Sequence, residues 1–221
     1  IRDSANMATM RCFLTTDAQV ERSFLQQALR SAVGESFNMI DIDGDTSTND
    51  TVLLLANGAS GVTVTKGTPD GETFTAALLE ICTYLAREMV KDGEGATKLI
   101  EVTVQGADSL KGARVAERAV SSSILVKTAI HGNDPNWGRI MMALGKSGAE
   151  LVEKNIALYI NDICIMEGGL PIPVFRESLI ASMQGTEIRI LANLNLGSDT
   201  AIARGCNMSE EFVTFNSAYT T

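Results

Sequence analysis

Residues 73–105, TFTAALLEICTYLAREMVKDGEGATKLIEVTVQ, carry the clearest structural pattern in the 221-residue chain. Over 73–90 the apolar residues recur at helical spacing, which predicts an amphipathic helix. Residues 92–95 end that helix, and 99–105 alternates apolar and polar residues, the pattern of a half-solvated strand. The apolar stripe of the helix comprises Ala77, Leu78, Ile81, Cys82, Leu85 and Met89. A helix leading directly into a strand indicates a mixed sheet and helix architecture.

Similar patterns on both sides of this stretch predict further elements. We expect strands at 11–15, 51–56, 156–160, 163–166, 186–195 and 201–206. We expect helices at 18–33 (capped by Asp17), 111–123, 136–144 and 175–183. Asn161-Asp162 is typical of a hairpin turn, and 201–206 is expected to pair with 186–195. The predicted fold class is α/β (α+β), with antiparallel pairing and no strong βαβ rhythm.

Composition limits the possible functions. The formal net charge of −9 and a pI near 4.7 argue against nucleic-acid or acidic-membrane partners, which need a basic surface. No run approaches the roughly 18–20 apolar residues of a membrane span, and residues 1–4 lack the order of a signal peptide. The four scattered cysteines favour reduced thiols in a cytoplasmic protein. With one histidine in the chain, a catalytic triad would have to use His131 or a residue of another chain.

Five separated segments carry a resemblance to a known family. They are Asn6–Met10, Asp41–Gly44 with Ser47–Val52, Asp92–Lys98, Lys127–Ala129 with Gly132–Arg139, and Asn216–Thr221. They follow one another in the family's order from residue 6 to the last residue. By these segments the chain resembles the self-cleaving ornithine acetyltransferase (glutamate N-acetyltransferase) family of arginine biosynthesis, in its β-chain part.

The resemblance implies cleavage between Ala8 and Thr9, with Thr9 as the catalytic nucleophile. It also implies a layered sheet and helix sandwich with three segments. These are a residual 1–8, a catalytic 9–148, and a smaller C-terminal α/β lobe at 149–221. A free α-amine has a pKa of about 7.7–8.0 and can act as base for its own hydroxyl, so no histidine is required. The implied reaction moves an acetyl group from N-acetylornithine to glutamate through acetyl-threonine, with acetyl-CoA as a possible second donor.

The same resemblance identifies substrate-binding residues: Thr9, Glu94, Asn216 and Thr221. Glu94 would face the ornithine amine, although a glutamate after a helix can also be a simple capping residue. Asn216 and Thr221 belong to a polar tail, which is often disordered. We expect this tail to dock through its apolar side chains, which are Phe212, Val213, Phe215 and Tyr219. No cofactor and no metal site are expected.

The implied partners are an α chain from the same precursor, in a heterotetramer of two α and two β chains, and small-molecule substrates. The α part would hold the substrate lysine and the oxyanion-hole threonine and glycine. Ala5 stands where the family has proline. Two alternatives remain open: an amide hydrolase or aminopeptidase on the same self-processing scaffold, and an unprocessed, non-catalytic paralogue.

Two other motifs indicate structure rather than chemistry. Residues 41–45 place three aspartates at alternate positions, but Gly44 comes too early for a calcium loop and Val52 replaces its bidentate glutamate. Residues 132–139 predict an architectural loop that packs Trp137, and His131 is interpreted as an ordinary surface or packing residue.

Overall fold

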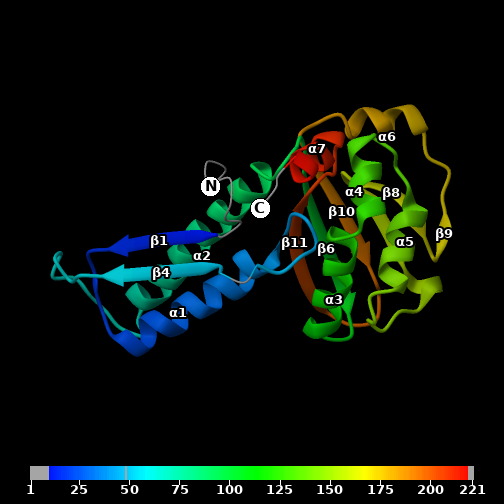
Figure 1. Cartoon of the computed structure of the whole chain (residues 1–221). Helices are drawn as coiled ribbons and strands as arrows, with labels where there is room; N and C mark the ends of the chain where they lie inside the picture. The colour runs from blue at the N-terminus through cyan, green and yellow to red at the C-terminus, as the bar shows by residue number, and fades with distance from the viewer. Residues whose placement is uncertain (1–9, 48, 219–221) are drawn as a thin grey trace. The chain divides into compact units, whose positions relative to one another are not determined.

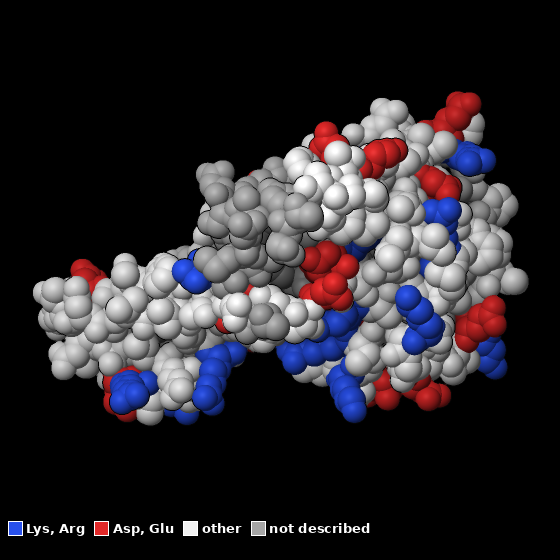
Figure 2. Space-filling model, viewed as in Figure 1, with Lys and Arg blue, Asp and Glu red and all other residues white. Residues whose placement is uncertain are grey.

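The computed structural model describes residues 10–47 and 49–218, which form two compact units (Figure 1). The first unit contains the described residues up to Asn38 together with Asp45–Ala86, and the second contains Met39–Gly44 and Arg87–Ala218. Strands and helices are mixed in both, so the predicted α/β class is confirmed. The face drawn in Figure 2 carries acidic and basic side chains in interspersed groups. No helix within the described ranges is long and apolar enough to cross a membrane.

The first unit is built on two parallel strands. Its elements are β1 (Arg11–Thr16), β2 (Gln19–Val20), α1 (Arg22–Glu35), β4 (Thr51–Ala56), β5 (Thr63–Val64) and the greater part of α2 (Pro69–Lys91). β1 and β4 pair in parallel over their whole length, and β2 pairs with β5. The predicted strands and the long helix are therefore present, and the helix begins earlier than expected because Pro69 suits a first helical turn.

One face of the β1–β4 pair remains largely exposed. Strand residues alternate between exposed and half-buried positions, as expected for a period of two. Phe13, Leu53 and Leu55 are 65%, 45% and 54% exposed, and we call these three residues the β1–β4 outer face. Parallel sheets are normally covered on both faces, so an exposed apolar face on a parallel pair of strands is unusual. The helices of this unit contribute a buried set of Phe24, Ala28, Ala32, Leu78, Cys82 and Ala86.

The N-terminus of α1 differs from the prediction. Asp17 was expected to cap a helix starting at residue 18, but Gln19 and Val20 are extended because they pair with β5. The cap is Glu21, whose carboxylate accepts hydrogen bonds from the amides of Ser23 and Phe24 at 3.0 and 3.3 Å. These bonds satisfy amides that lack partners at a helix start. The Ser23 hydroxyl also donates to this carboxylate, and it lowers the pKa of Glu21 most, followed by the Ser23 amide. Tertiary pairing thus moved the helix start by several residues.

All four cysteines are free thiols. Burial, with a further contribution from the neighbouring Cys12, raises the pKa of Cys82 to about 11. Burial also raises the pKa of Cys206. Because the thiolate is the reactive form, these buried cysteines are expected to be inert.

The second unit contains a seven-stranded sheet in the order β3-β11-β6-β10-β7-β8-β9. Its strands are β3 (Ile40–Asp41), β6 (Leu99–Ala107), β7 (Ala157–Ile160), β8 (Ile163–Glu167), β9 (Leu170–Pro171), β10 (Glu187–Asn193) and β11 (Asp199–Cys206). The hairpin predicted at Asn161-Asp162 joins β7 and β8 as an antiparallel pair. β6 is parallel to β10, and β3 is parallel to β11, so the expectation of antiparallel pairing holds for only part of the sheet.

The predicted pairing between 201–206 and 186–195 is wrong. β11 pairs with β6 on the side opposite to β10, so β6 lies between them. The connection crosses the end of β6: the amides of Leu196 and Gly197 both donate to the carbonyl of Gly106, at 2.7 and 2.9 Å. Gly197 is needed there, since a Cβ would lie 2.3 Å from the carbonyl oxygen of Ala107. A crossing of this kind leaves no periodic trace in the sequence.

Five helices belong wholly to the second unit: α3 (Leu110–Ser121), α4 (Ile124–His131), α5 (Trp137–Gly145), α6 (Arg176–Ser182) and α7 (Glu210–Ala218). α3 packs on β6 and β11, and α5 packs on α3 and α4. The predicted helix 111–123 corresponds to α3, and α4, which follows it after a break at Ser122-Ser123, was not predicted. Side-chain oxygens of Ser109 and Asn136 cap α3 and α5.

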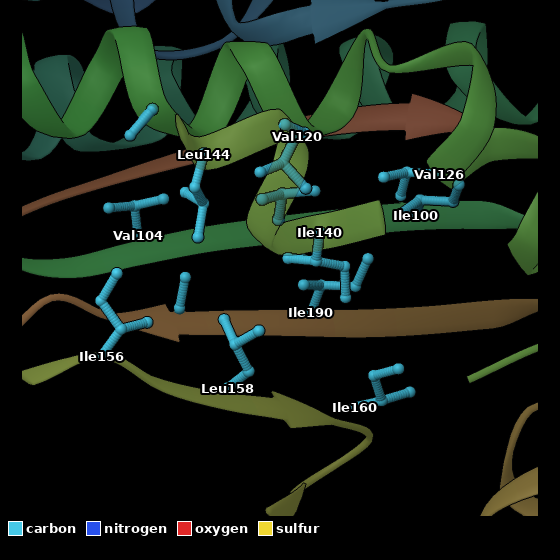
Figure 3. Close-up of a cluster of buried hydrophobic side chains, with 14 of the residues drawn as sticks. Ile100, Val104, Val120, Val126, Ile140, Leu144, Ile156, Leu158, Ile160 and Ile190 are labelled. Atoms are coloured by element: carbon cyan, nitrogen blue, oxygen red, sulfur yellow. The ribbon is translucent and has the colours of Figure 1, made fainter. Parts of the chain in front are cut away.

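The core of the second unit lies between its sheet and these helices (Figure 3). Alternate residues of the central strands face it, and α3 and α5 supply the opposing side chains. The labelled members are Ile100, Val104, Val120, Val126, Ile140, Leu144, Ile156, Leu158, Ile160 and Ile190. Full burial of such a side chain contributes about 1.5–3 kcal/mol, so this cluster is the main source of stability in the unit.

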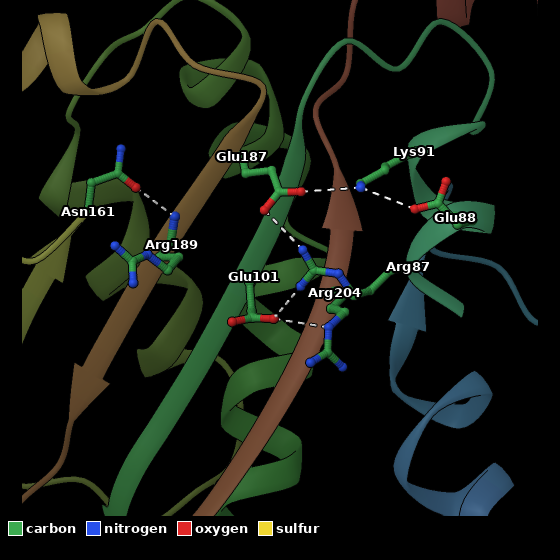
Figure 4. A network of polar contacts seen from close by, with 8 residues as sticks. All are labelled: Arg87, Glu88, Lys91, Glu101, Asn161, Glu187, Arg189 and Arg204. Atoms are coloured by element: carbon green, nitrogen blue, oxygen red, sulfur yellow. Dashed lines mark hydrogen bonds and ion pairs between the residues drawn. The ribbon is translucent and has the colours of Figure 1, made fainter. Parts of the chain in front are cut away.

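The residues between those core positions form an ion-pair network on the other side of the strands (Figure 4). Glu101 of β6 accepts from Arg87 at 3.1 Å and from Arg204 at 3.0 Å. Glu187 of β10 pairs with Arg87 and with Lys91, at 2.9 and 3.2 Å. Exposed ion pairs each contribute roughly 0–1 kcal/mol. Their consequence is geometric: they fasten the last turns of α2, just before residues 92–95, to the central strands.

Candidate functional site

The structure brings together two of the predicted site residues, Glu94 and Asn216. The Asn216 amide donates to Glu94 Oε2 at 2.7 Å and to the carbonyl oxygen of Phe212 at 2.9 Å. Both partners are acceptors, which fixes the amide nitrogen as the atom that faces them. The described residues give the second carboxyl oxygen of Glu94 no hydrogen bond, and the side chain is only partly buried. A carboxylate with one free oxygen can bind a cationic or amine group of a ligand.

Glu94 lies in a tight turn between the end of α2 and the start of β6. The Gly93 carbonyl accepts from the Ala96 amide at 2.9 Å, and Gly95 has a φ of 67°. Glycine is favoured at such a backbone angle. A Cβ at Gly95 would also lie 2.7 Å from the Phe212 amide nitrogen and from Ser209 Oγ. Gly95 therefore allows α7, which carries Asn216, to lie directly against the turn that carries Glu94.

Asn207 and Ser209, which precede α7, fasten it to this turn. Asn207 Oδ1 accepts from the amides of Thr97 and Lys98 at 2.9 and 2.7 Å, and the Asn207 side chain is buried. Ser209 Oγ donates to the Gly95 carbonyl at 2.7 Å. The C-terminal side of the Glu94 turn is thus bonded to the segment leading into α7.

The expected apolar docking of the tail is not what holds α7. Val213 and Phe215 are 62% and 41% exposed, and Phe212 is half-buried. Tyr219 lies outside the described residues. Polar contacts from residues 207–216 therefore do most of the fastening.

His131 is more than an ordinary packing residue. Its Nδ1 lies 2.9 Å from Asn207 Nδ2, and its Nε2 lies 3.2 Å from Glu210 Oε2, in the first turn of α7. Trp137 also differs from the prediction: it heads α5, is 38% exposed and borders a hollow of about 400 Å³ with Pro171 and Arg176. The loop between His131 and Trp137 was interpreted from sequence as architecture alone.

Lys98 joins this loop to the rest of the second unit. Its ammonium donates to the carbonyls of Ile130 and Met183, at 3.1 and 2.8 Å, and to Asn133 Oδ1. Burial lowers the pKa of Lys98. The lysine supplies donors to carbonyls at the ends of α4 and α6, where helices lack internal partners.

A buried group of charges lies on the other side of α4. Lys127 is almost completely buried, and its ammonium donates to the Ile42 carbonyl at 2.6 Å and pairs with Asp41 at 2.5 Å. Glu117 of α3 is fully buried, and neither of its carboxyl oxygens has a hydrogen-bond partner in the described part of the chain. Burial raises the pKa of Glu117 to about 8, against the opposing effects of Arg118 and Arg114. Glu117 is consequently a protonated acid at neutral pH.

The other two predicted site residues, Thr9 and Thr221, lie outside the described residues, as does Ala8. The contact nearest to Thr9 in sequence belongs to Met10, in the first unit. The backbone amide of Met10 donates to Asp50 Oδ1 at 2.9 Å, and the Met10 carbonyl accepts from the Thr51 amide at 2.9 Å. Both the backbone amide and the carbonyl of Met10, the residue that follows Thr9, are therefore hydrogen-bonded.

Sequence reasoning missed Asn207, Ser209, His131 and Asp50 as partners of the predicted site. Each acts through a contact that spans 40 residues or more, and no local pattern marks such a contact. Residues 10–47 and 49–218 contain no group of three or more His, Cys, Asp or Glu side chains that could hold a metal ion. The Asp41–Asp45 segment instead supplies the partner of Lys127.

Comparisons with known proteins find similar sequences and a similar structure. The model of the ArgJ family matches residues 4–221. The chain is 46% identical to the arginine biosynthesis bifunctional protein ArgJ of Dehalococcoides mccartyi over 98% of its length. It is 44% identical to the glutamate N-acetyltransferase of Methanocaldococcus jannaschii over 97%. It spans about half of each relative, 54% in both cases. The crystal structure of ArgJ from Bacillus halodurans superposes with a TM-score of 0.92 at 40% identity, covering 95% of this chain and 100% of that one.

Proposed function

The chain belongs to the ArgJ family, and we propose that it is the β chain of an acetyltransferase that moves an acetyl group from N-acetylornithine to glutamate. The observation that carries the proposal is the Glu94–Asn216 pair, which joins two residues that the family resemblance assigns to one substrate site. The names of the relatives support acetyl transfer in arginine biosynthesis. Such an enzyme would act in the cytoplasm on small molecules.

The proposed nucleophile is Thr9, freed by cleavage after Ala8. The Thr9 hydroxyl attacks the Ala8 carbonyl, the acyl group shifts from nitrogen to oxygen, and water hydrolyses the ester to leave a free α-amine. In each catalytic cycle the hydroxyl attacks the acetyl carbonyl while the amine takes its proton, which then passes to the departing ornithine amine. The glutamate amine next attacks acetyl-threonine and restores the hydroxyl. Glu94 would hold the ornithine side-chain ammonium, with Asn216 and Thr221 closing the site.

Two observations support separation of this half of the protein by cleavage. The full-length relatives are matched over only 54% of their length, whereas the solved Bacillus halodurans chain is matched over all of its length. A homologous enzyme therefore carries this half as a chain of its own. The backbone of Met10, which follows the proposed cleavage site, is held by hydrogen bonds with Asp50 and Thr51.

The proposed partner is the α chain from the same precursor, in a heterotetramer of two α and two β chains. The β1–β4 outer face supports this proposal, because two parallel strands with an exposed apolar face are not a complete sheet, and the α chain would cover that face. The α chain would also supply the oxyanion hole, a contribution of several kcal/mol to catalysis. Within this chain, 9–148 would hold Thr9 and Glu94, and 149–221 would form the lobe with the substrate-contacting tail.

The direct test is an acetyl-transfer assay on the full precursor, with both parts co-produced and the native mass recorded. We expect N-acetylglutamate and ornithine from N-acetylornithine and glutamate, and the native mass of a heterotetramer. Parallel reactions with acetyl-CoA decide whether it is a second donor. Release of free acetate without N-acetylglutamate would instead identify an amide hydrolase, and a stable uncleaved precursor would identify a non-catalytic paralogue.

Replacing Glu94 by glutamine tests its role at the substrate amine. The variant keeps the shape and one acceptor for Asn216 but loses the negative charge. Because hydrogen bonds to charged groups are worth about 1.5–3 kcal/mol, we expect the KM for N-acetylornithine to rise about ten- to hundredfold. Self-cleavage and the unfolding midpoint should be retained. Glu88→Gln, in the last turns of α2, is the control, and an unaltered KM in Glu94→Gln would leave Glu94 as a capping residue.

A further inference from the structure

We propose that His131 and Asn207 form a positioning pair that holds Glu94 and Asn216 in their binding geometry. The inference rests on the proposed function, because it concerns the residues assigned there to substrate binding. Neither His131 nor Asn207 is assigned a contact with substrate. They act by fixing the two segments that carry the substrate-binding residues.

Asn207 uses its whole side chain for this task. Its Oδ1 accepts two backbone amides directly after the Glu94 turn, those of Thr97 and Lys98. Its Nδ2 donates to Thr97 Oγ1 and lies next to His131 Nδ1, both at 2.9 Å. Because Asn207 is only 2% exposed, water cannot readily replace a hydrogen bond that its side chain loses. Asn207 therefore has only one orientation that satisfies all its partners.

This orientation determines the state of His131. Since Asn207 Nδ2 is a donor, His131 Nδ1 must be an acceptor and carry no proton. The remaining proton is on Nε2, which lies 3.2 Å from Glu210 Oε2. The imidazole thus lies between Asn207 and the first turn of α7, with one nitrogen next to each. The tautomer follows from the hydrogen-bond network.

The position of α7 depends on these contacts because its apolar anchoring is weak. Its large apolar residue Val213 is 62% exposed, and the helix has no fully buried residue. Ser209 and Gly95 fix where the helix starts, and His131 lies against its first turn, with Nε2 3.2 Å from Glu210 Oε2. A shift there moves Asn216, which lies in the same helix, away from Glu94. The arrangement resembles a support that sets ligand geometry without touching the ligand.

The test compares three variants of His131 in the full, self-cleaved enzyme. His131→Ala removes both contacts, His131→Asn keeps a short acceptor toward Asn207, and His131→Gln reaches toward Glu210. We expect His131→Ala to raise the KM for N-acetylornithine about tenfold, with kcat changed less than about threefold. Self-cleavage should be unchanged. His131→Asn should recover most of the affinity, because Asn207 is the buried partner.

Two measurements do not depend on activity. Hydrogen exchange should show faster exchange in residues 210–218 of His131→Ala than in the parent, with the core strands unchanged. The ¹⁵N shifts of the parent imidazole should report a proton on Nε2 alone at neutral pH. Lys146→Ala, an exposed residue after α5, is the matched control and should change neither result.

The proposal is overturned by an unchanged KM together with unchanged exchange in α7, or by a proton on Nδ1. It is also overturned if His131→Ala and His131→Asn lose kcat, cleavage and thermal stability together, since that would indicate a general structural role. An effect of Glu94→Gln without an effect of His131→Ala refutes only this inference. Absence of acetyl transfer in the parent refutes the proposed function, while hydrogen exchange still decides whether His131 holds α7.

Discussion

Replacing Thr9 by alanine in the full precursor is expected to leave the protein uncleaved and without acetyl-transfer activity. The methyl side chain cannot attack the Ala8 carbonyl, so no ester forms and no α-amine is released. Catalysis would lose its nucleophile and its base at once. The expected loss of rate is at least a thousandfold, on the order of the effects seen when a covalent nucleophile is removed. An SDS gel for cleavage and an acetyl-transfer rate measure the two consequences.

Two variants separate this role from a structural one. Thr9→Ser keeps the hydroxyl and should retain slow cleavage. Thr73→Ala, an exposed position in α2, should cleave and turn over like the parent. If Thr9→Ala still separates into two chains at the Ala8–Thr9 bond, another residue performs the processing, and the proposed assignment fails.

The sequence predicted individual elements better than their arrangement. The strands at 11–16 and 51–56, the long helix and the β7–β8 hairpin were correct because apolar periodicity and turn residues act locally. The order of β10, β6 and β11 was not predictable in this way. It depends on a backbone crossing at Gly106 and Gly197, two residues that are far apart in the sequence. The start of α1 was missed for a similar reason, since the pairing of β2 with a distant strand kept residues 19–20 extended.

The site was predictable where the family segments supplied it, and only there. Periodicity alone leaves Glu94 as a cap and Asn216 as part of a polar tail, and their 2.7 Å contact spans 122 residues. His131 and Asn207 carry no recognisable spacing at all. For one buried polar residue, Glu117, the sequence pattern does indicate burial. Within the predicted helix 111–123, Glu117 lies three and four residues from buried Val120 and Ala113, on the face that turned out to pack on the sheet.

Glu117→Gln is expected to stabilise the protein at alkaline pH and to have little effect at acidic pH. Burial raises the pKa of Glu117 from the ordinary 4.5 to about 8. Below pH 4.5 the folded and unfolded states are both protonated, so the shift costs nothing. Between pH 4.5 and 8 the unfolded state loses its proton while the folded state keeps it, and the free energy of unfolding falls by up to about 1.4 kcal/mol per pH unit. Above pH 8 the penalty is constant, on the order of 5 kcal/mol.

Glutamine imitates the protonated acid, so the variant pays no such penalty as the pH rises. Urea unfolding at pH 5, 6.5 and 8.5 should give parent and variant curves that nearly coincide at the lowest pH and separate by several kcal/mol at the highest. Glu150→Gln, an exposed glutamate in the same unit, should follow the parent throughout, since water surrounds that side chain in both states. Parallel curves for parent and Glu117→Gln from pH 5 to 8.5 would mean that the Glu117 carboxylate has a stabilising partner in solution. Arg114 and Arg118 could provide one, since their charges already oppose the effect of burial on its pKa.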